Sequence, residues 1–73
     1  ALAAGPEGLD VINRLIDEAP PFLVPAGWLL LEISPRQADA VRARLEGSDA
    51  YEEVGAARDL SGQVRVIVAR RRT

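Results

Sequence analysis

Apolar residues recur along this chain in two periods, which predict a helix first and strands later. Between positions 9 and 22 they recur at spacings of three and four, the pattern of a helix with one buried face. Pro6 and Glu7 suit the start of this helix, and the pair Pro20 and Pro21 is expected to end it. The predicted stripe consists of Leu9, Ile12, Ile16 and Ala19, with Val11, Leu15 and Phe22 alongside it.

The middle of the chain predicts a strand and a second helix. Residues 28–33 form a short and nearly continuous apolar run, which is typical of a strand covered on both faces. Ser34, Pro35 and Gln37 then form the start pattern of a helix, in which Ser34 and Gln37 make a capping box. The helix is expected to bury Ala38, Val41 and Leu45, to pair Arg42 with Glu46, and to end at Gly47.

The last third of the chain predicts an antiparallel hairpin of strands 51–58 and 63–69, joined by a turn at 59–62. Gly55 indicates a bulge or a close backbone approach, and Asp59 and Arg65 are expected to form an ion pair that holds the hairpin. Residues 1–8 are expected to be a loop, Pro25 to Gly27 a turn and residues 70–73 a solvated tail. The predicted order is helix, strand, helix, strand, strand, in one small α/β domain.

Composition narrows the chemistry that these 73 residues can perform. The chain has no cysteine and no histidine, which excludes disulfides, thiolate chemistry and the commonest general base and metal ligand. Its net charge of −2 argues against nonspecific nucleic-acid binding, and no apolar run is long enough to span a membrane. We therefore expect a cytoplasmic protein with no metal site and no direct contact with nucleic acid or membrane.

Glu32 is the one candidate for a substrate-side residue, because it lies near the C-terminal end of an apolar strand, where open α/β sheets bind ligands. The alternative is a carboxylate hydrogen-bonded at the strand end for structural reasons. Gln37 and Trp28 each have a ligand-contact interpretation, but capping suits Gln37 better and a core or interface position suits Trp28 better. The arginines at 70–72 are interpreted as a solvated end rather than an RNA contact.

Three phrases carry a family resemblance: Ala-Leu-Ala-Ala-Gly-Pro-Glu-Gly-Leu-Asp at 1–10, Gly-Trp-Leu-Leu-Leu-Glu-Ile-Ser-Pro-Arg-Gln at 27–37, and Asp-Leu-Ser-Gly-Gln-Val-Arg-Val at 59–66. Together they resemble the C-terminal part of the HemK-type N5-glutamine methyltransferases, which modify peptide-chain release factors. The chain departs from the family pattern at Ala3 and Ala4, at Ala26 and at Ser34. Ala3 and Ala4 put in doubt any role of that segment near the substrate.

The resemblance implies the C-terminal half of a Rossmann-like methyltransferase sheet, with 28–33, 51–58 and 63–69 as its fifth, sixth and seventh strands. The seventh strand would lie between the other two. The family binds S-adenosylmethionine at a glycine-rich loop and the acceptor glutamine at an Asn-Pro-Pro-Tyr motif, and neither occurs in residues 1–73. The chain is therefore expected to be a partial domain without the cofactor-binding half, to have no catalytic or cofactor-binding residue, and to be inactive alone. Because it does not begin with methionine, it is also expected to come from something longer.

Two other functions are compatible with the same sequence. One is a noncatalytic α/β module that self-associates, as a homodimer or a swapped assembly, through a free edge at strand 28–33. The other is part of a different class I methyltransferase, acting on RNA or a ribosomal protein, because the fold alone does not separate these substrates.

Overall fold

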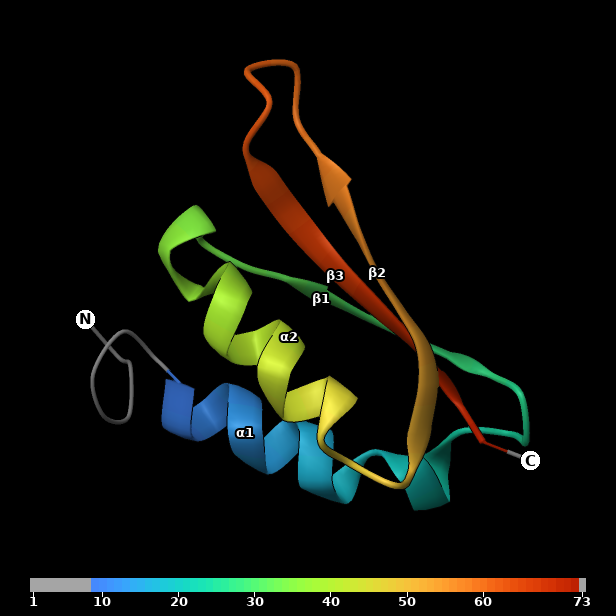
Figure 1. The fold of residues 1–73 in the computed structure, drawn as a ribbon. Helices are drawn as coiled ribbons and strands as arrows, with labels where there is room; N and C mark the ends of the chain where they lie inside the picture. The colour runs from blue at the N-terminus through green and yellow to red at the C-terminus, as the bar shows by residue number, and fades with distance from the viewer. Residues whose placement is uncertain (1–8, 73) are drawn as a thin grey trace.

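The computed structural model describes residues 9–72, which form two helices against a three-stranded sheet (Figure 1). The expected loop at 1–8 and helix start at Pro6 and Glu7 lie outside the described residues. The predicted order is confirmed, with a short 3₁₀ turn before β1 and another before α2. The elements are α1 (Leu9–Glu18), η2 (Pro20–Phe22), β1 (Trp28–Glu32), η3 (Pro35–Gln37), α2 (Ala38–Glu46), β2 (Tyr51–Arg58) and β3 (Val64–Arg71).

Helix α1 ends at Glu18, immediately before the proline pair, as the sequence predicts. Ile16 is fully buried on its inner side, and Leu9 and Ile12 pack partly buried against the same core. Val11 and Leu15, which the sequence places beside the stripe, instead lie on the exposed side of the helix, 53% and 46% accessible. Phe22, in η2, is also exposed, so the apolar residues of the region 9–22 are more numerous than the core buries.

The strand order in the sheet is β1-β3-β2, with β3 antiparallel to both neighbours. The last strand in sequence therefore lies in the middle, and β1 and β2 run parallel to each other at the two edges. This is the strand arrangement that the family resemblance implies for the end of the chain. It leaves one side of β1 without a hydrogen-bonded neighbour among residues 9–72.

The two helices pack on one face of the sheet and leave its other face bare within the described part of the chain (Figure 1). Along β1 the pattern alternates, with Leu31 buried and Trp28 and Leu30 exposed. The expectation that both faces of this strand are covered is therefore wrong for the described chain. The covered face holds one core, consisting of Ile16, Leu31, Ile33, Val41, Leu45, Tyr51, Ile67 and Ala69.

The start of the second helical segment is organised by the predicted capping box. The Gln37 side chain accepts a hydrogen bond of 2.9 Å from the Ser34 backbone N–H, and the Ser34 hydroxyl accepts one of 3.3 Å from Arg36 N–H. The first turn, with Pro35 at its start, is 3₁₀, and the α-helix follows it. These bonds satisfy backbone donors that a helix start leaves free.

Asp59 organises the turn of the β2–β3 hairpin. Its carboxylate accepts four hydrogen bonds. One oxygen accepts from the Ser61 N–H and hydroxyl and from Gln63 N–H, and the other accepts from Arg65 Nε at 2.7 Å. The Ser61 hydroxyl and the Arg65 guanidinium hold the pKa of Asp59 well below its usual range. The predicted ion pair is confirmed, and the strand register shifts between Glu52 and Gly55, which is compatible with a bulge next to Gly55.

The interpretation of the chain end from residue 70 as a solvated tail is wrong for the described residues, because β3 continues to Arg71. Residue 73 lies outside the described residues. The Arg71 guanidinium donates to the Leu23 carbonyl at 2.5 Å, and Arg72 lies 3.6 Å from the Glu52 carboxylate. Arg71 is thus tied to the segment before β1 and Arg72 to β2. The backbone N–H groups of both residues also donate to carbonyls, those of Gly27 and Ala50, which extends the pairing beyond the end of the apolar alternation. A run of arginines does not reveal such partners in a sequence.

A tight turn joins η2 to β1, and one residue in it is strained. Gly27 N–H donates to the Val24 carbonyl at 2.8 Å, and Pro25 stands at the first central position, as in a type II turn. Ala26, at the second central position, has φ of +67°, a conformation that favours glycine. The family resemblance implies a glycine at this position, and a positive φ favours glycine for the same physical reason.

Replacing Ala26 by glycine is expected to raise the free energy of unfolding by about 0.5–1 kcal/mol. A left-handed conformation costs an alanine about 1–2 kcal/mol, and the greater freedom of glycine in the unfolded chain offsets part of that gain. Urea denaturation would show a higher midpoint with an unchanged slope. Gly62→Ala is the reverse control. Gly62 has φ of +87°, so placing alanine there is expected to lower the free energy of unfolding. A lower midpoint for Ala26→Gly would contradict the turn geometry.

Candidate functional site

Glu32 ends strand β1 with its side chain exposed to solvent. Its carboxylate makes no hydrogen bond or ion pair among residues 9–72, although its strand neighbour Ile33 is tied by its N–H to the Arg65 carbonyl at 2.9 Å. The alternative of a structural, hydrogen-bonded carboxylate is therefore not what the described structure shows. A free acidic group at the carboxyl end of a strand can accept hydrogen bonds or attract a cation, and it is not shielded from water.

Trp28 lies at the opposite end of β1, on the bare face of the sheet. The ring is 47% exposed, and the Arg70 guanidinium carbon lies 5.8 Å from its centroid. Arg70 also donates to the Glu53 carboxylate at 3.1 Å and to the Ala26 carbonyl at 3.3 Å. The ring is thus held in place by a cation whose own position is set by two further contacts, which favours an interface position over a mobile surface side chain.

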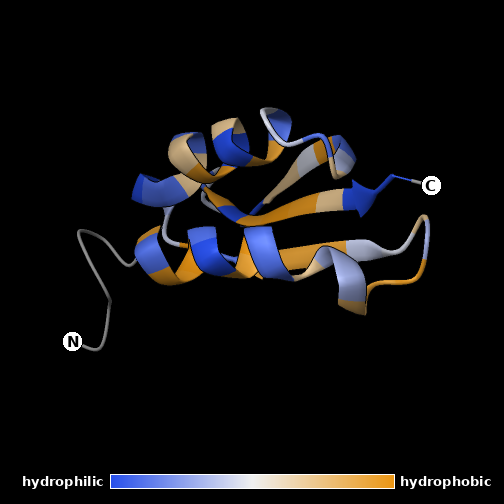
Figure 2. Cartoon of the chain, turned by 90° about the horizontal axis from the view of Figure 1, so that it is seen from below, coloured by the Kyte–Doolittle hydropathy of each residue, from blue (hydrophilic) through white to orange (hydrophobic). Residues whose placement is uncertain are grey.

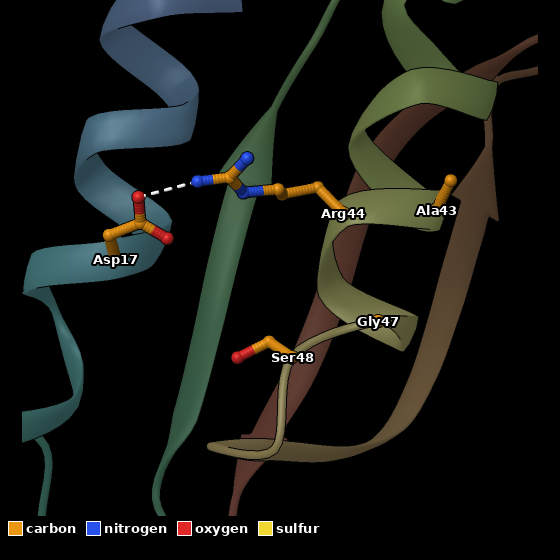
Figure 3. Close-up of a pocket in the computed structure, with 5 residues that line it drawn as sticks. All are labelled: Asp17, Ala43, Arg44, Gly47 and Ser48. Carbon is orange, nitrogen blue, oxygen red and sulfur yellow. Dashed lines mark hydrogen bonds and ion pairs between the residues drawn. The ribbon is translucent and has the colours of Figure 1, made fainter.

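A shallow pocket lies between the end of α1 and the end of α2, lined by Asp17, Ala43, Arg44, Gly47 and Ser48 (Figure 3). Arg44 donates to the Asp17 carboxylate at 2.5 Å, and both side chains are about half exposed. Exposed pairs of this kind contribute at most about 1 kcal/mol. The pocket holds no nucleophile paired with a base. Its Arg44–Asp17 ion pair links the two helices and has no catalytic arrangement around it.

The structure does not bring the sequence-predicted residues together into one site. Glu32 and Trp28 are at opposite ends of β1, and Gln37 is used in the capping box. Among residues 9–72, no group of three or more histidine, cysteine, aspartate or glutamate side chains is placed to hold a metal ion. Neither described helix is long and apolar enough to cross a membrane.

Tyr51 is the buried polar side chain that the sequence analysis missed. It begins β2, is 2% exposed, and donates its hydroxyl to the Ile16 carbonyl at 2.6 Å. The residue four places after Ile16 is Pro20, which has no N–H to offer to that carbonyl. A proline four residues beyond a helical carbonyl is the sequence signal that such an external donor is needed, although it does not say which residue supplies it.

Comparison with known proteins finds relatives that share the same protein name. The chain is 46% identical over 71 residues to the release factor glutamine methyltransferase of Coxiella burnetii, covering 97% of the chain and 25% of that protein. The protein of the same name from Deinococcus radiodurans is also 46% identical over 97% of the chain, and that from Thermosynechococcus vestitus is 42% identical over 94%. The match covers the C-terminal part of these proteins, so the chain spans about a quarter of their length. No protein-family model matches the chain, and no solved structure does.

Proposed function

We propose that this chain, which matches the C-terminal quarter of release factor glutamine methyltransferases over nearly all of its own length, completes the catalytic domain of such an enzyme. The whole enzyme would transfer a methyl group from S-adenosylmethionine to the side-chain amide nitrogen of a glutamine in a peptide-chain release factor. The chain itself would supply neither the cofactor site nor the acceptor site. It would be inactive alone, in a protein of the cytoplasm.

The observation that carries the proposal is the extent of the match, which takes in almost all of this chain and one end of its relatives. The sheet supports it physically. Strand β1 has a free edge, and the face that bears Trp28 and Leu30 is apolar and uncovered among the described residues. Exposed apolar edges and faces of this kind are rare in finished monomeric domains, because they invite association.

The proposed place of these strands is the end of a Rossmann-like sheet. Strands β1 and β2 are parallel to each other and β3 lies antiparallel between them, which fits the fifth, sixth and seventh strands of a class I methyltransferase. An upstream parallel strand would pair with the free edge of β1. The carboxyl end of β1, where Glu32 lies, would then face the crevice in which open α/β sheets bind ligands.

Glu32 is proposed to orient the substrate at this crevice rather than to react. Its carboxylate is exposed and has no partner among residues 9–72, so it is available to accept a hydrogen bond from an incoming amide N–H. In an active enzyme, Glu32→Gln would then raise KM for the release factor more than it lowers kcat. Unchanged kinetics with unchanged stability would remove Glu32 from the site.

A chimera tests the proposed function directly. This chain would replace the C-terminal quarter of the Coxiella burnetii enzyme, and transfer of labelled methyl groups from S-adenosylmethionine to a release factor would be measured. We expect the chimera to be active, and the same enzyme truncated before that quarter to be inactive, as is the 73-residue chain. A folded chimera without activity toward the release factor would contradict the proposal. Activity toward RNA or a ribosomal protein instead would favour a different methyltransferase of this fold.

Self-association through β1 is the second candidate, and the free edge of that strand favours it. Two copies could pair their β1 edges, either as a homodimer or by exchanging an element. Sedimentation of the 73-residue chain at tens of micromolar distinguishes the two candidates. A clean monomer at that concentration would exclude the self-associating module.

A further inference from the structure

Helix α1 has an apolar side that is wider than the part of it that packs in the core. Val11 and Leu15 are one turn apart on this side and are 53% and 46% exposed, although the buried stripe on the inner side already holds the helix to the sheet. Figure 2 shows hydrophobic and hydrophilic residues on α1. The apolar ones fall on one side of the helix, so Val11 and Leu15 form the edge of that side that the core does not cover. A stripe about 100° wide is enough for a helix that packs on one layer, and these two residues extend the apolar side beyond that width.

These two side chains belong to a groove whose remaining walls are charged. The groove is lined by Val11, Arg14, Leu15 and Glu18, and we call it the α1 groove. The Arg14 guanidinium donates to the Glu18 carboxylate at 2.8 Å, so the two charges along its rim already satisfy each other. An apolar centre with a paired, solvent-exposed rim is the composition of an interface between domains or subunits.

We propose that the α1 groove is the docking surface for the preceding three quarters of the same methyltransferase, a contact separate from the pairing of strands at the β1 edge. The inference rests on the proposed function. It commits to this occupant because about three quarters of the relatives' length lies outside the match, on the N-terminal side, and α1 is the first described element after that junction. A surface next to the junction is covered at little cost in chain entropy, because the covering segment is already tethered nearby.

The test uses the chimera described above and one double variant, Val11→Gln with Leu15→Gln. In the chimera we expect a melting temperature lowered by several degrees, and faster hydrogen exchange of the α1 amides, because the contact across the groove is lost. In the 73-residue chain the urea midpoint should stay unchanged, because both side chains already face water there. Leu60→Gln is the matched control: Leu60 is fully exposed at the hairpin turn, and the change should alter neither protein.

The readouts separate this inference from the proposed function. Activity of the unmodified chimera reports on the function, whereas the difference in melting temperature between the double variant and the control reports on docking. Equal melting temperatures for the double variant and the unmodified chimera would overturn the proposal. An unchanged melting temperature with a raised KM for the release factor would overturn it as well, because the groove would then receive the substrate. A dimeric chain that the double variant converts to a monomer would identify a second copy as the occupant instead.

Discussion

Replacing Leu45 by alanine is expected to lower the free energy of unfolding by about 2–5 kcal/mol. Leu45 lies on α2, is 0% exposed, and belongs to the single core between the helices and the sheet. Truncation removes apolar contacts and leaves a cavity that a small domain can close only in part. A core of this size rarely supplies more than about 3–5 kcal/mol of net stability. Most molecules of the variant are therefore expected to be unfolded or close to unfolding at room temperature.

Urea denaturation followed by far-ultraviolet circular dichroism measures this loss, and Leu60→Ala is its matched control. The control makes the same substitution at a fully exposed position, where a change of less than about 0.5 kcal/mol is expected. In the chimera, Leu45→Ala should reduce methyl transfer through loss of folded protein, with the KM of the remaining activity unchanged. Similar midpoints for the Leu45 and Leu60 variants would mean that the helices do not pack on the sheet as described.

Local chemistry explains which parts of the fold could be predicted from the sequence. The capping box at Ser34 and Gln37 and the helix end before Pro20 each depend on residues within a few positions, and all appear in the structure. The central place of β3 followed from the family resemblance and not from periodicity, because alternation in 63–69 does not say which strand is its second neighbour. Long-range order of this kind is not encoded in a local pattern.

The errors share a physical cause, which is that burial depends on what lies opposite a residue. The run 28–33 is apolar except for Glu32, yet only one face of β1 is covered in residues 9–72. Val11 and Leu15 match an apolar stripe but lie outside the core. In the proposed enzyme both observations have one explanation, since these residues would meet polypeptide that is not part of this chain. In that enzyme the apolar pattern would reflect contacts that residues 9–72 alone do not make.

The hydroxyl of Tyr51 is expected to contribute about 1–3 kcal/mol to stability, and Tyr51→Phe should remove it. The hydroxyl donates to the Ile16 carbonyl at 2.6 Å, and Pro20 cannot replace it because proline has no N–H. Phenylalanine would fill the same space and leave that carbonyl without a donor in a buried position. The expected result is a lower urea midpoint at neutral pH with an unchanged slope.

The same side chain gives the chain an alkaline titration of its own. Burial, and secondarily the charge of Asp17, raise the pKa of Tyr51 above its ordinary value of 10.0. The unfolded chain therefore loses this proton at a lower pH than the folded chain does. The free energy of unfolding should stay level up to about pH 10 and then fall until the folded phenol also ionises.

The fall in stability above pH 10 can be assigned to Tyr51 because the chain has no other tyrosine and no histidine or cysteine. All nine of its basic residues are arginine. Arginine remains protonated throughout the range, and the terminal amino group is common to both proteins. Tyr51→Phe should therefore abolish the fall in stability above pH 10 while being less stable than the parent below it. Phenolate absorbance would give the folded pKa independently. An alkaline fall of equal size in the variant would show that the hydroxyl is not the titrating group, and the bond between β2 and the end of α1 would lose its support.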